Sequence, residues 1–158
     1  MLKEREMRRH DRELSKEKAE KILSECTYGI LATVGEDGYP YGIPVSYAYS
    51  DGAIYFHCAN DTGHKLDNIK YCDKVCFTVV GNTEILPEKF STIFESTVVF
   101  GKIGVVEGEE KLKAFMYIVE KYSKAFMTEG RKYAEQSGHQ ALVYKIVPEK
   151  ISGKARKK

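Results

Sequence analysis

The sequence has 158 residues, enough for one domain with a substantial hydrophobic core. Hydrophobic residues make up 42% and charged residues 30%, as in ordinary globular proteins, and a formal net charge of only +2 argues against a strong overall attraction to nucleic acid or membrane. No apolar run is long enough to cross a bilayer, and the N-terminus is too charged for a signal peptide. We therefore expect a cytoplasmic protein whose cysteines are reduced.

Basic residues gather at both ends of the chain. They are Arg5, Arg8, Arg9 and Arg12 near the start, and Lys154, Arg156, Lys157 and Lys158 at the end. We interpret these runs as solvated ends, with nucleic-acid binding as the less favoured alternative. Because no internal repeat, low-complexity block or long linker interrupts the sequence, residues 1–158 are expected to form a single domain with an N-terminal helix and a basic C-terminal tail.

The first predicted helix follows Ser15, a residue type that caps helix N-termini. One face of this helix carries Ala19, Ile22, Leu23 and Cys26 at helical spacing. Strand-like runs then cover 28–34, 41–49 and 53–58, and the turn sequences GEDGYP and SDG separate them. Connections this short make neighbouring strands antiparallel.

The hydrophobic period changes after the third run. Residues 63–71 place Leu66 and Ile69 three apart, which predicts a short amphipathic helix. β-Branched and aromatic residues return at 74–80 and 94–107 and predict two more strands.

A longer helix is predicted over about 109–126, and a last strand over 141–147 precedes the basic tail. The helix carries an apolar stripe suited to core packing, which consists of Leu112, Phe115, Met116, Val119 and Tyr122. Several strands with few helices favour a mainly β fold, a barrel or strongly bent antiparallel sheet, over a doubly wound α/β fold.

Common nucleotide and hydrolase motifs are missing from the sequence. No G-x-G-x-x-G follows a strand and opens a helix, and no G-x-x-x-x-G-K-[ST] occurs. The nucleophile elbow G-x-S-x-G is also absent. A Rossmann dinucleotide site, a P-loop and an α/β-hydrolase site are therefore not expected.

Residues 57–65, HCANDTGHK, combine several chemically reactive side chains. Zinc is not favoured, because the spacings among His57, Cys58, His64, Cys72 and Cys76 do not form two close ligand pairs. Adjacent strand residues such as His57 and Cys58 also point to opposite faces. Cysteines in apolar surroundings behave as small hydrophobes, which leaves Cys58 as the one thiol beside a possible site.

An anion site fits the same segment better. Thr62, Gly63, His64 and Lys65 lie where a strand and loop lead into the short helix, and free N–H groups at a helix N-terminus favour phosphate. Thr62 would be the N-cap, Gly63 would allow close backbone approach, and His64 and Lys65 would add donors. The alternative, in which Thr62 only caps the helix and Lys65 is a surface residue, stays equally open on spacing alone.

The sequence from 43 to 80, IPVSYAYSDGAIYFHCANDTGHKLDNIKYCDKVCFTVV, resembles the FMN-binding split-barrel proteins related to pyridoxamine-phosphate oxidase. Within this family it is most similar to the nitroimidazole-resistance branch. The likeness continues through MRRHDRE (7–13), FESTVVFGKIGVVE (94–107) and YKIVPEKISGKARKK (144–158). It implies an antiparallel split β-barrel, FMN-binding type, that forms a homodimer with FMN at the subunit interface.

The resemblance also assigns residues to that site. The strand along the flavin ring corresponds to Pro44, Val45, Ser46 and Tyr47. The end of the neighbouring strand corresponds to His57, Cys58 and Ala59. The segment that binds the phosphate corresponds to Gly63, His64 and Lys65, with Thr62 before it. His57 takes the place of a histidine close to flavin and substrate, so it is the candidate catalytic residue. Four aromatic side chains either wall the ring or fill the barrel, namely Tyr47, Tyr49, Tyr55 and Phe56.

The function implied is an oxidoreductase that passes electrons or hydride from FMN to a small-molecule acceptor, such as a nitroaromatic compound. Three alternatives remain. The protein could bind or sense flavin without turnover, it could bind haem through His57 or His64, or its basic ends could bind nucleic acid.

Overall fold

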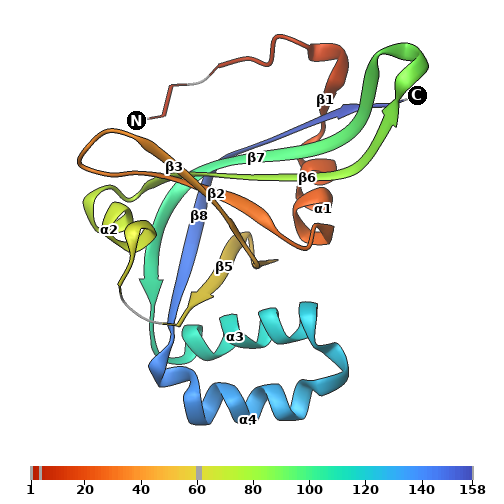
Figure 1. Ribbon diagram of the computed structural model, residues 1–158. Helices are drawn as coiled ribbons and strands as arrows, with labels where there is room; N and C mark the ends of the chain where they lie inside the picture. The colour runs from red at the N-terminus through yellow and green to blue at the C-terminus, as the bar shows by residue number, and fades with distance from the viewer. Residues whose placement is uncertain (1, 4, 60–61, 158) are drawn as a thin grey trace.

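A computed structural model of the protein describes residues 2–3, 5–59 and 62–157. Residues 60 and 61, inside the 57–65 segment, and Lys158 of the basic end lie outside it. The main feature of the described part is an antiparallel sheet of eight strands in the order β3-β2-β6-β7-β8-β5-β4, with β1 paired to β8 (Figure 1). The strands are β1 (Glu13–Leu14), β2 (Gly29–Val34), β3 (Pro40–Val45), β4 (Ala48–Ser50), β5 (Ala53–Cys58), β6 (Lys74–Leu86), β7 (Ser91–Val106) and β8 (Leu142–Arg156). The expected mainly β, antiparallel fold is confirmed.

The three longest strands, β6, β7 and β8, bend the sheet around a core (Figure 1). The β7–β8 register shifts between Phe100 and Gly101, and such irregularities bend a strand. Gly101 is required there because a Cβ on it would lie 2.4 Å from the carbonyl oxygen of Val147. The bend brings both ends of the sheet toward one another, which gives the split-barrel shape.

Alternation along the strands separates a barrel interior from an outer face. The interior cluster contains large, fully buried side chains that include Leu31, Tyr47, Phe56, Phe77, Val99 and Ile146. A second cluster lies on the other side of β5 and β8, and it contains Tyr55, Val106, Phe115, Ala134 and Val143. β5 therefore contributes residues to both cores and has little freedom to shift register.

Four α-helices flank the sheet in the described residues: α1 (Lys16–Glu25), α2 (His64–Tyr71), α3 (Gly108–Tyr122) and α4 (Met127–Ser137). Ser15 caps α1 as expected, since its hydroxyl accepts from the Lys18 N–H at 3.4 Å. Three short 3-10 helices, at His10–Arg12, Pro87–Lys89 and Lys124–Phe126, join other elements, and a fourth spans Gly138–Gln140. None of the helices described is long and apolar enough to span a membrane.

α3 and α4 form a helical hairpin next to β5 (Figure 1). The sequence predicted one helix over 109–126 and no helix after it, so α4 is a correction. Its segment MTEGRKYAEQS has little apolar character, and Gly130 lowers its helix propensity. The glycine is explained by packing, because a Cβ at this position would lie 2.4 Å from a methyl group of Val119 on α3.

The predicted continuous strand over 41–49 is wrong. The chain leaves the sheet at Ser46 and Tyr47, between β3 and β4. These two strands are the opposite edges of the sheet, so the residues that join them cannot continue either ladder. The last strand was also predicted too short. β8 continues pairing with β7 as far as Arg156, so the expected basic tail is largely strand.

Candidate functional site

Several of the predicted site residues lie where β5 ends, α2 begins and β3 forms the sheet edge, whereas Tyr47 and Cys58 belong to the core. His57 faces outward from β5, whereas the side chain of Cys58 is 9% exposed and joins the barrel core. These neighbours therefore point to opposite sides of β5, as the alternation along a strand predicts. Within the described residues, no group of three or more His, Cys, Asp or Glu side chains could hold a metal.

His57 lies between an aromatic ring and a positive charge. Its imidazole centroid is 5.7 Å from the ring centroid of Phe115 on α3. Although the residue retains an exposed side, partial burial lowers the pKa of His57, and the charge of Lys65 lowers it further. Both effects favour the neutral imidazole, which has one N–H donor and one nitrogen acceptor.

The N-terminus of α2 has a different cap from the one predicted. Gly63 is the N-cap, with φ 125° and ψ 158°, and no side chain accepts a capping hydrogen bond, so the prediction that Thr62 caps the helix is wrong. Only glycine adopts this backbone conformation readily, and a Cβ here would meet no atom within 4 Å. The requirement for glycine at 63 is therefore conformational and does not come from crowding.

The first turn of α2 presents donors toward solvent. The carbonyl of Gly63 accepts from the N–H groups of Leu66, at 2.8 Å, and Asp67, at 3.1 Å. The N–H groups of His64 and Lys65 come earlier in the helix, where no intrahelical acceptor exists. These two amides and the positive end of the helix dipole form a site of the kind that binds phosphate.

The side chains of His64 and Lys65 tie this turn to the sheet. His64 stacks on Tyr41 of β3, with ring centroids 4.0 Å apart and planes at 28°. The ammonium of Lys65 lies 5.4 Å from the ring centroid of Phe56 on β5. The start of α2 is thus held against both β3 and β5. No pattern in the sequence indicated the Tyr41 contact.

β3 supplies exposed backbone rather than side chains. Pro44 and Val45 pair with Ile30 and Gly29 of β2 on one side. The other side of β3 has no partner strand within the described residues, because β3 ends the sheet order. Edge strands present free N–H and C=O groups. The backbone from Pro44 to Ser46 can therefore contact a flat ligand beside α2.

The aromatic side chains proposed as walls of the site mostly fill the core. Tyr47 and Phe56 are fully buried and Tyr55 is 3% exposed. The hydroxyl of Tyr47 donates to the carbonyl of Leu23. Tyr49 is half-buried, and its hydroxyl donates to Glu20 at 2.9 Å. Alternation along each strand had left both interpretations open. Barrel filling is the correct one for Tyr47 and Phe56, whereas Tyr55 packs in the second cluster beside α3.

Tyr122, from the last turn of α3, holds the break between β3 and β4. Its hydroxyl oxygen accepts from the N–H of Tyr47 at 2.9 Å, and its proton faces the carbonyls of Tyr47 and Thr27. Next to it, the ammonium of Lys121 donates to the carbonyl of Cys26 at 2.6 Å and lies 3.9 Å from the ring centroid of Tyr47. Sequence analysis placed Tyr122 on the apolar stripe and missed this role.

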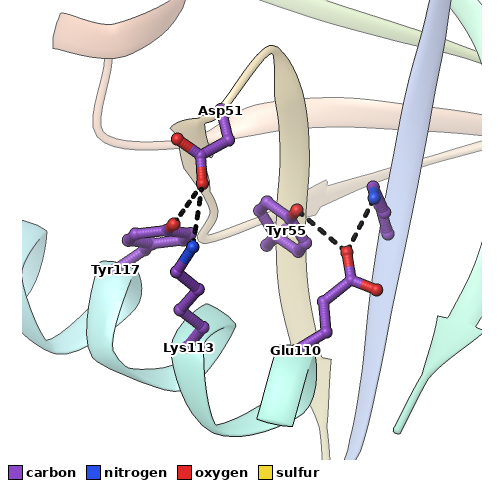
Figure 2. Close-up of polar contacts among 6 residues, drawn as sticks. Asp51, Tyr55, Glu110, Lys113 and Tyr117 are labelled. Atoms are coloured by element: carbon purple, nitrogen blue, oxygen red, sulfur yellow. Dashed lines mark hydrogen bonds and ion pairs between the residues drawn. The ribbon is translucent and has the colours of Figure 1, made fainter.

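A polar network fixes the opposite end of α3 to the β4–β5 turn (Figure 2). The hydroxyl of Tyr117 donates to Asp51, and the ammonium of Lys113 lies 3.6 Å from the same carboxylate. Glu110 accepts from Tyr55 at 3.2 Å and from Lys145 at 2.6 Å. Together with the Tyr122 contacts, these bonds set the position of Phe115 beside His57.

The four cysteines are free thiols. Burial raises the pKa of Cys76, and it also raises the pKa of Cys26, where the nearby Lys121 charge opposes the shift. A raised pKa lowers the thiolate fraction and with it the reactivity. Neither thiol has the properties of a catalytic nucleophile.

The model of the family described as pyridoxamine 5'-phosphate oxidase matches residues 15–155, nearly the whole chain. The chain belongs to this family. No curated protein matches the sequence.

Solved structures share the fold. A candidate 5-nitroimidazole antibiotic resistance protein from Bacteroides thetaiotaomicron is 22% identical, with a TM-score of 0.78 over 90% of this chain and 86% of that chain. A FAD-binding protein from Mesorhizobium loti is 22% identical, with a TM-score of 0.65 over 92% and 98% of the two chains. A FAD and heme binding protein from Mycobacterium smegmatis is 15% identical, with a TM-score of 0.77 over 91% and 72%. These likenesses establish the split-barrel architecture.

Proposed function

We propose that the protein is a cytoplasmic FMN-dependent oxidoreductase that transfers electrons or hydride to a small acceptor of the nitroaromatic class. The observation that carries the proposal is the convergence of the α2 N-terminus, the free edge of β3 and the outward-facing His57. An anion site beside an exposed backbone edge matches a ligand with a phosphate at one end and a planar ring at the other.

Each part of the site has a separate task in this proposal. The amides of His64 and Lys65 and the Lys65 ammonium would hold the phosphate. The backbone from Pro44 to Ser46 would line the ring edge. When bound, FMN would supply the redox chemistry.

His57 would act on the acceptor as a neutral group. The lowered pKa of His57 keeps one ring nitrogen protonated and the other free. The N–H can donate a hydrogen bond to an oxygen of the electron-accepting molecule, and the free nitrogen can later hold a proton. Phe115 limits the rotation of the imidazole and shields one of its faces from water. The names of two structural relatives support a flavin ligand, and that of a third supports a nitroimidazole acceptor.

The visible spectrum of the protein as purified, followed by mass spectrometry of the released cofactor, tests the ligand. Flavin bands with FMN mass are expected, and a Soret band or released FAD would contradict the assignment. Oxidation of NADH or NADPH with and without a nitroaromatic acceptor then tests turnover. A protein that binds FMN but oxidises neither donor would be a flavin-binding protein without activity.

We further propose that the protein is a homodimer formed through the outer face of its sheet. Most interior residues of β2, β6 and β7 are apolar, as a core requires, but several of the outward positions between them are apolar too. They include Ile30, Cys76, Val80, Val98 and Phe100, of which Ile30 is 38%, Val80 56% and Phe100 39% exposed. If this face of the sheet met only water, polar outward residues would alternate with the apolar inward residues along each strand. A second copy of the chain would bury this face and enclose the neighbouring flavin site.

A further inference from the structure

The two basic ends of the sequence meet at one surface of the molecule. β1 pairs with the final part of β8, which places Glu13 opposite Lys154 and Leu14 opposite Gly153 (Figure 1). The pairing brings the short helix His10–Arg12 and the first turn of α1 beside the end of β8. Between them lies a cavity of about 480 Å³, within the usual size range of small-molecule sites. We call it the terminal basic pocket.

Five cations from three elements line this pocket. They are Arg9 and Arg12 next to β1, Lys18 in α1, and Arg156 and Lys157 at the end of β8. Two carboxylates, Asp11 and Glu13, also line it, so the pocket has an excess of three positive charges, whereas the whole chain has a net charge of +2. The charge is therefore concentrated in this concavity rather than spread over the surface.

Most of this charge has no carboxylate partner. Arg9 forms two bonds to Asp11, at 2.7 and 2.5 Å, and the Nε of Arg12 lies 4.0 Å from the same carboxylate. Across the described chain, no ion pair within 4.0 Å involves Lys18, Arg156 or Lys157. An anion entering the pocket would meet these cations without displacing an ion pair.

The pocket is also built on rigid backbone. Gly153 of β8 has no room for a side chain, because a Cβ there would lie 2.7 Å from the Cβ of Ala19. This close approach fixes α1, and with it Lys18, against β8. Ala155, 6% exposed, lies among the residues that line the cavity. Lys18 and Arg156 thus project from a packed helix and a strand.

We propose that the terminal basic pocket binds the phosphate groups of a phosphorylated small molecule of the pyrophosphate class. Guanidinium groups bind phosphate oxygens in pairs, and lysines from other directions neutralise the remaining charge. The concave shape fits a compact anion better than the extended backbone of a nucleic acid, which needs a continuous basic stripe, and Asp11 and Glu13 interrupt such a stripe here. The pocket lies at the opposite end of β8 from Leu142, the residue that pairs with Cys58, so it is separate from the proposed flavin site.

Calorimetric titration of the purified full-length protein with inorganic pyrophosphate tests the proposal. Saturable binding is expected, and the double variant Arg12→Gln/Arg156→Gln should weaken it at least about tenfold. The variant Lys124→Gln/Lys132→Gln removes the same charge from the α3–α4 hairpin and should change the affinity less than about twofold. Asp11→Asn, which removes a competing carboxylate, should tighten binding.

Three results would overturn the proposal: no saturable binding at millimolar pyrophosphate, equal weakening in both double variants, or binding of a single-stranded oligonucleotide that pyrophosphate does not displace. The last result would assign the surface to nucleic acid. Thermal unfolding shows whether each variant is folded. Lys18→Gln/Lys157→Gln, which alters only side chains at the pocket rim, repeats the test if the arginine variant is unstable.

Discussion

His57 and Lys65 influence each other although they lie on different elements. The charge of Lys65 is one of the two causes that lower the pKa of His57, and burial is the larger cause. The lysine that would neutralise a phosphate therefore also helps to keep the histidine neutral. The effect of Lys65 on His57 does not follow from sequence spacing, because the two residues come together only through the packing of α2 beside β5.

Replacing Lys65 with alanine should weaken FMN binding at least about tenfold, since a charge-assisted bond to the phosphate is lost. The free energy of unfolding should change little, because the lysine is half exposed. Quenching of flavin fluorescence measures the affinity. Lys74→Ala, which changes an exposed lysine at the start of β6, serves as the control. An unchanged affinity in Lys65→Ala would place the phosphate elsewhere.

Acid should destabilise the fold in part through His57. Because the pKa of His57 in the folded protein is below its usual value of 6.5, the unfolded chain binds the proton more readily as the pH falls. The free energy of unfolding should therefore decrease below about pH 6.5. Urea titrations of the flavin-free protein between pH 7 and 5 should show a flatter dependence for His57→Gln. If His10→Gln flattened the profile equally, the effect would not belong to this site.

At the scale of elements, the break between β3 and β4 depends on α3. The chain passes from one sheet edge to the other through Ser46 and Tyr47, and the backbone groups of Tyr47 are paired with the Tyr122 hydroxyl in place of a neighbouring strand. In the sequence YGIPVSYAY the residues least favourable to strand, Gly42 and Pro44, lie inside β3 and not at the break, so local propensity did not reveal the interruption. The information lies in a residue far along the chain, which sequence reasoning had assigned to simple packing.

Tyr122→Phe should reduce the free energy of unfolding by about 1–3 kcal/mol, because backbone groups of Tyr47 and Thr27 lose their partner. The loss of stability should be near the lower end of this range, since Tyr122 is 39% exposed and water can replace part of the hydrogen bonding. Guanidinium unfolding measures the change. Tyr133→Phe on α4 removes a hydroxyl from an exposed tyrosine and should be neutral. Equal stability of the two variants would show that the hydroxyl of Tyr122 contributes nothing.

For the whole molecule, the sequence predicted the antiparallel fold, because alternation and turn residues are local signals. It did not predict α4, the extension of β8 or the meeting of the basic ends. Each of these depends on contacts between distant residues, such as Gly130 against Val119 or Glu13 opposite Lys154. The site residues stay a prediction from spacing and resemblance, and their geometry could be described only from the fold.

Val98→Lys should convert the proposed dimer to monomers, because it places a charge in the middle of the apolar outer face. Multi-angle light scattering during size-exclusion chromatography measures the mass. Val105→Lys changes an exposed valine elsewhere on β7 and should leave the dimer intact. A dimer that persists in Val98→Lys would place the interface on another surface, and a monomeric parent protein would contradict the dimer itself.

The bond between Tyr47 and Tyr122 also provides a probe of motion. The amide proton of Tyr47 is held by a side chain of α3, whereas those of the β2–β3 ladder are held by another strand. Hydrogen–deuterium exchange at Tyr47 should therefore follow the detachment of the last turn of α3, and exchange in the ladder should follow opening of the sheet. Comparison of the Tyr47 amide resonance with those of the β2–β3 ladder thus separates two local unfolding events in the unmodified protein.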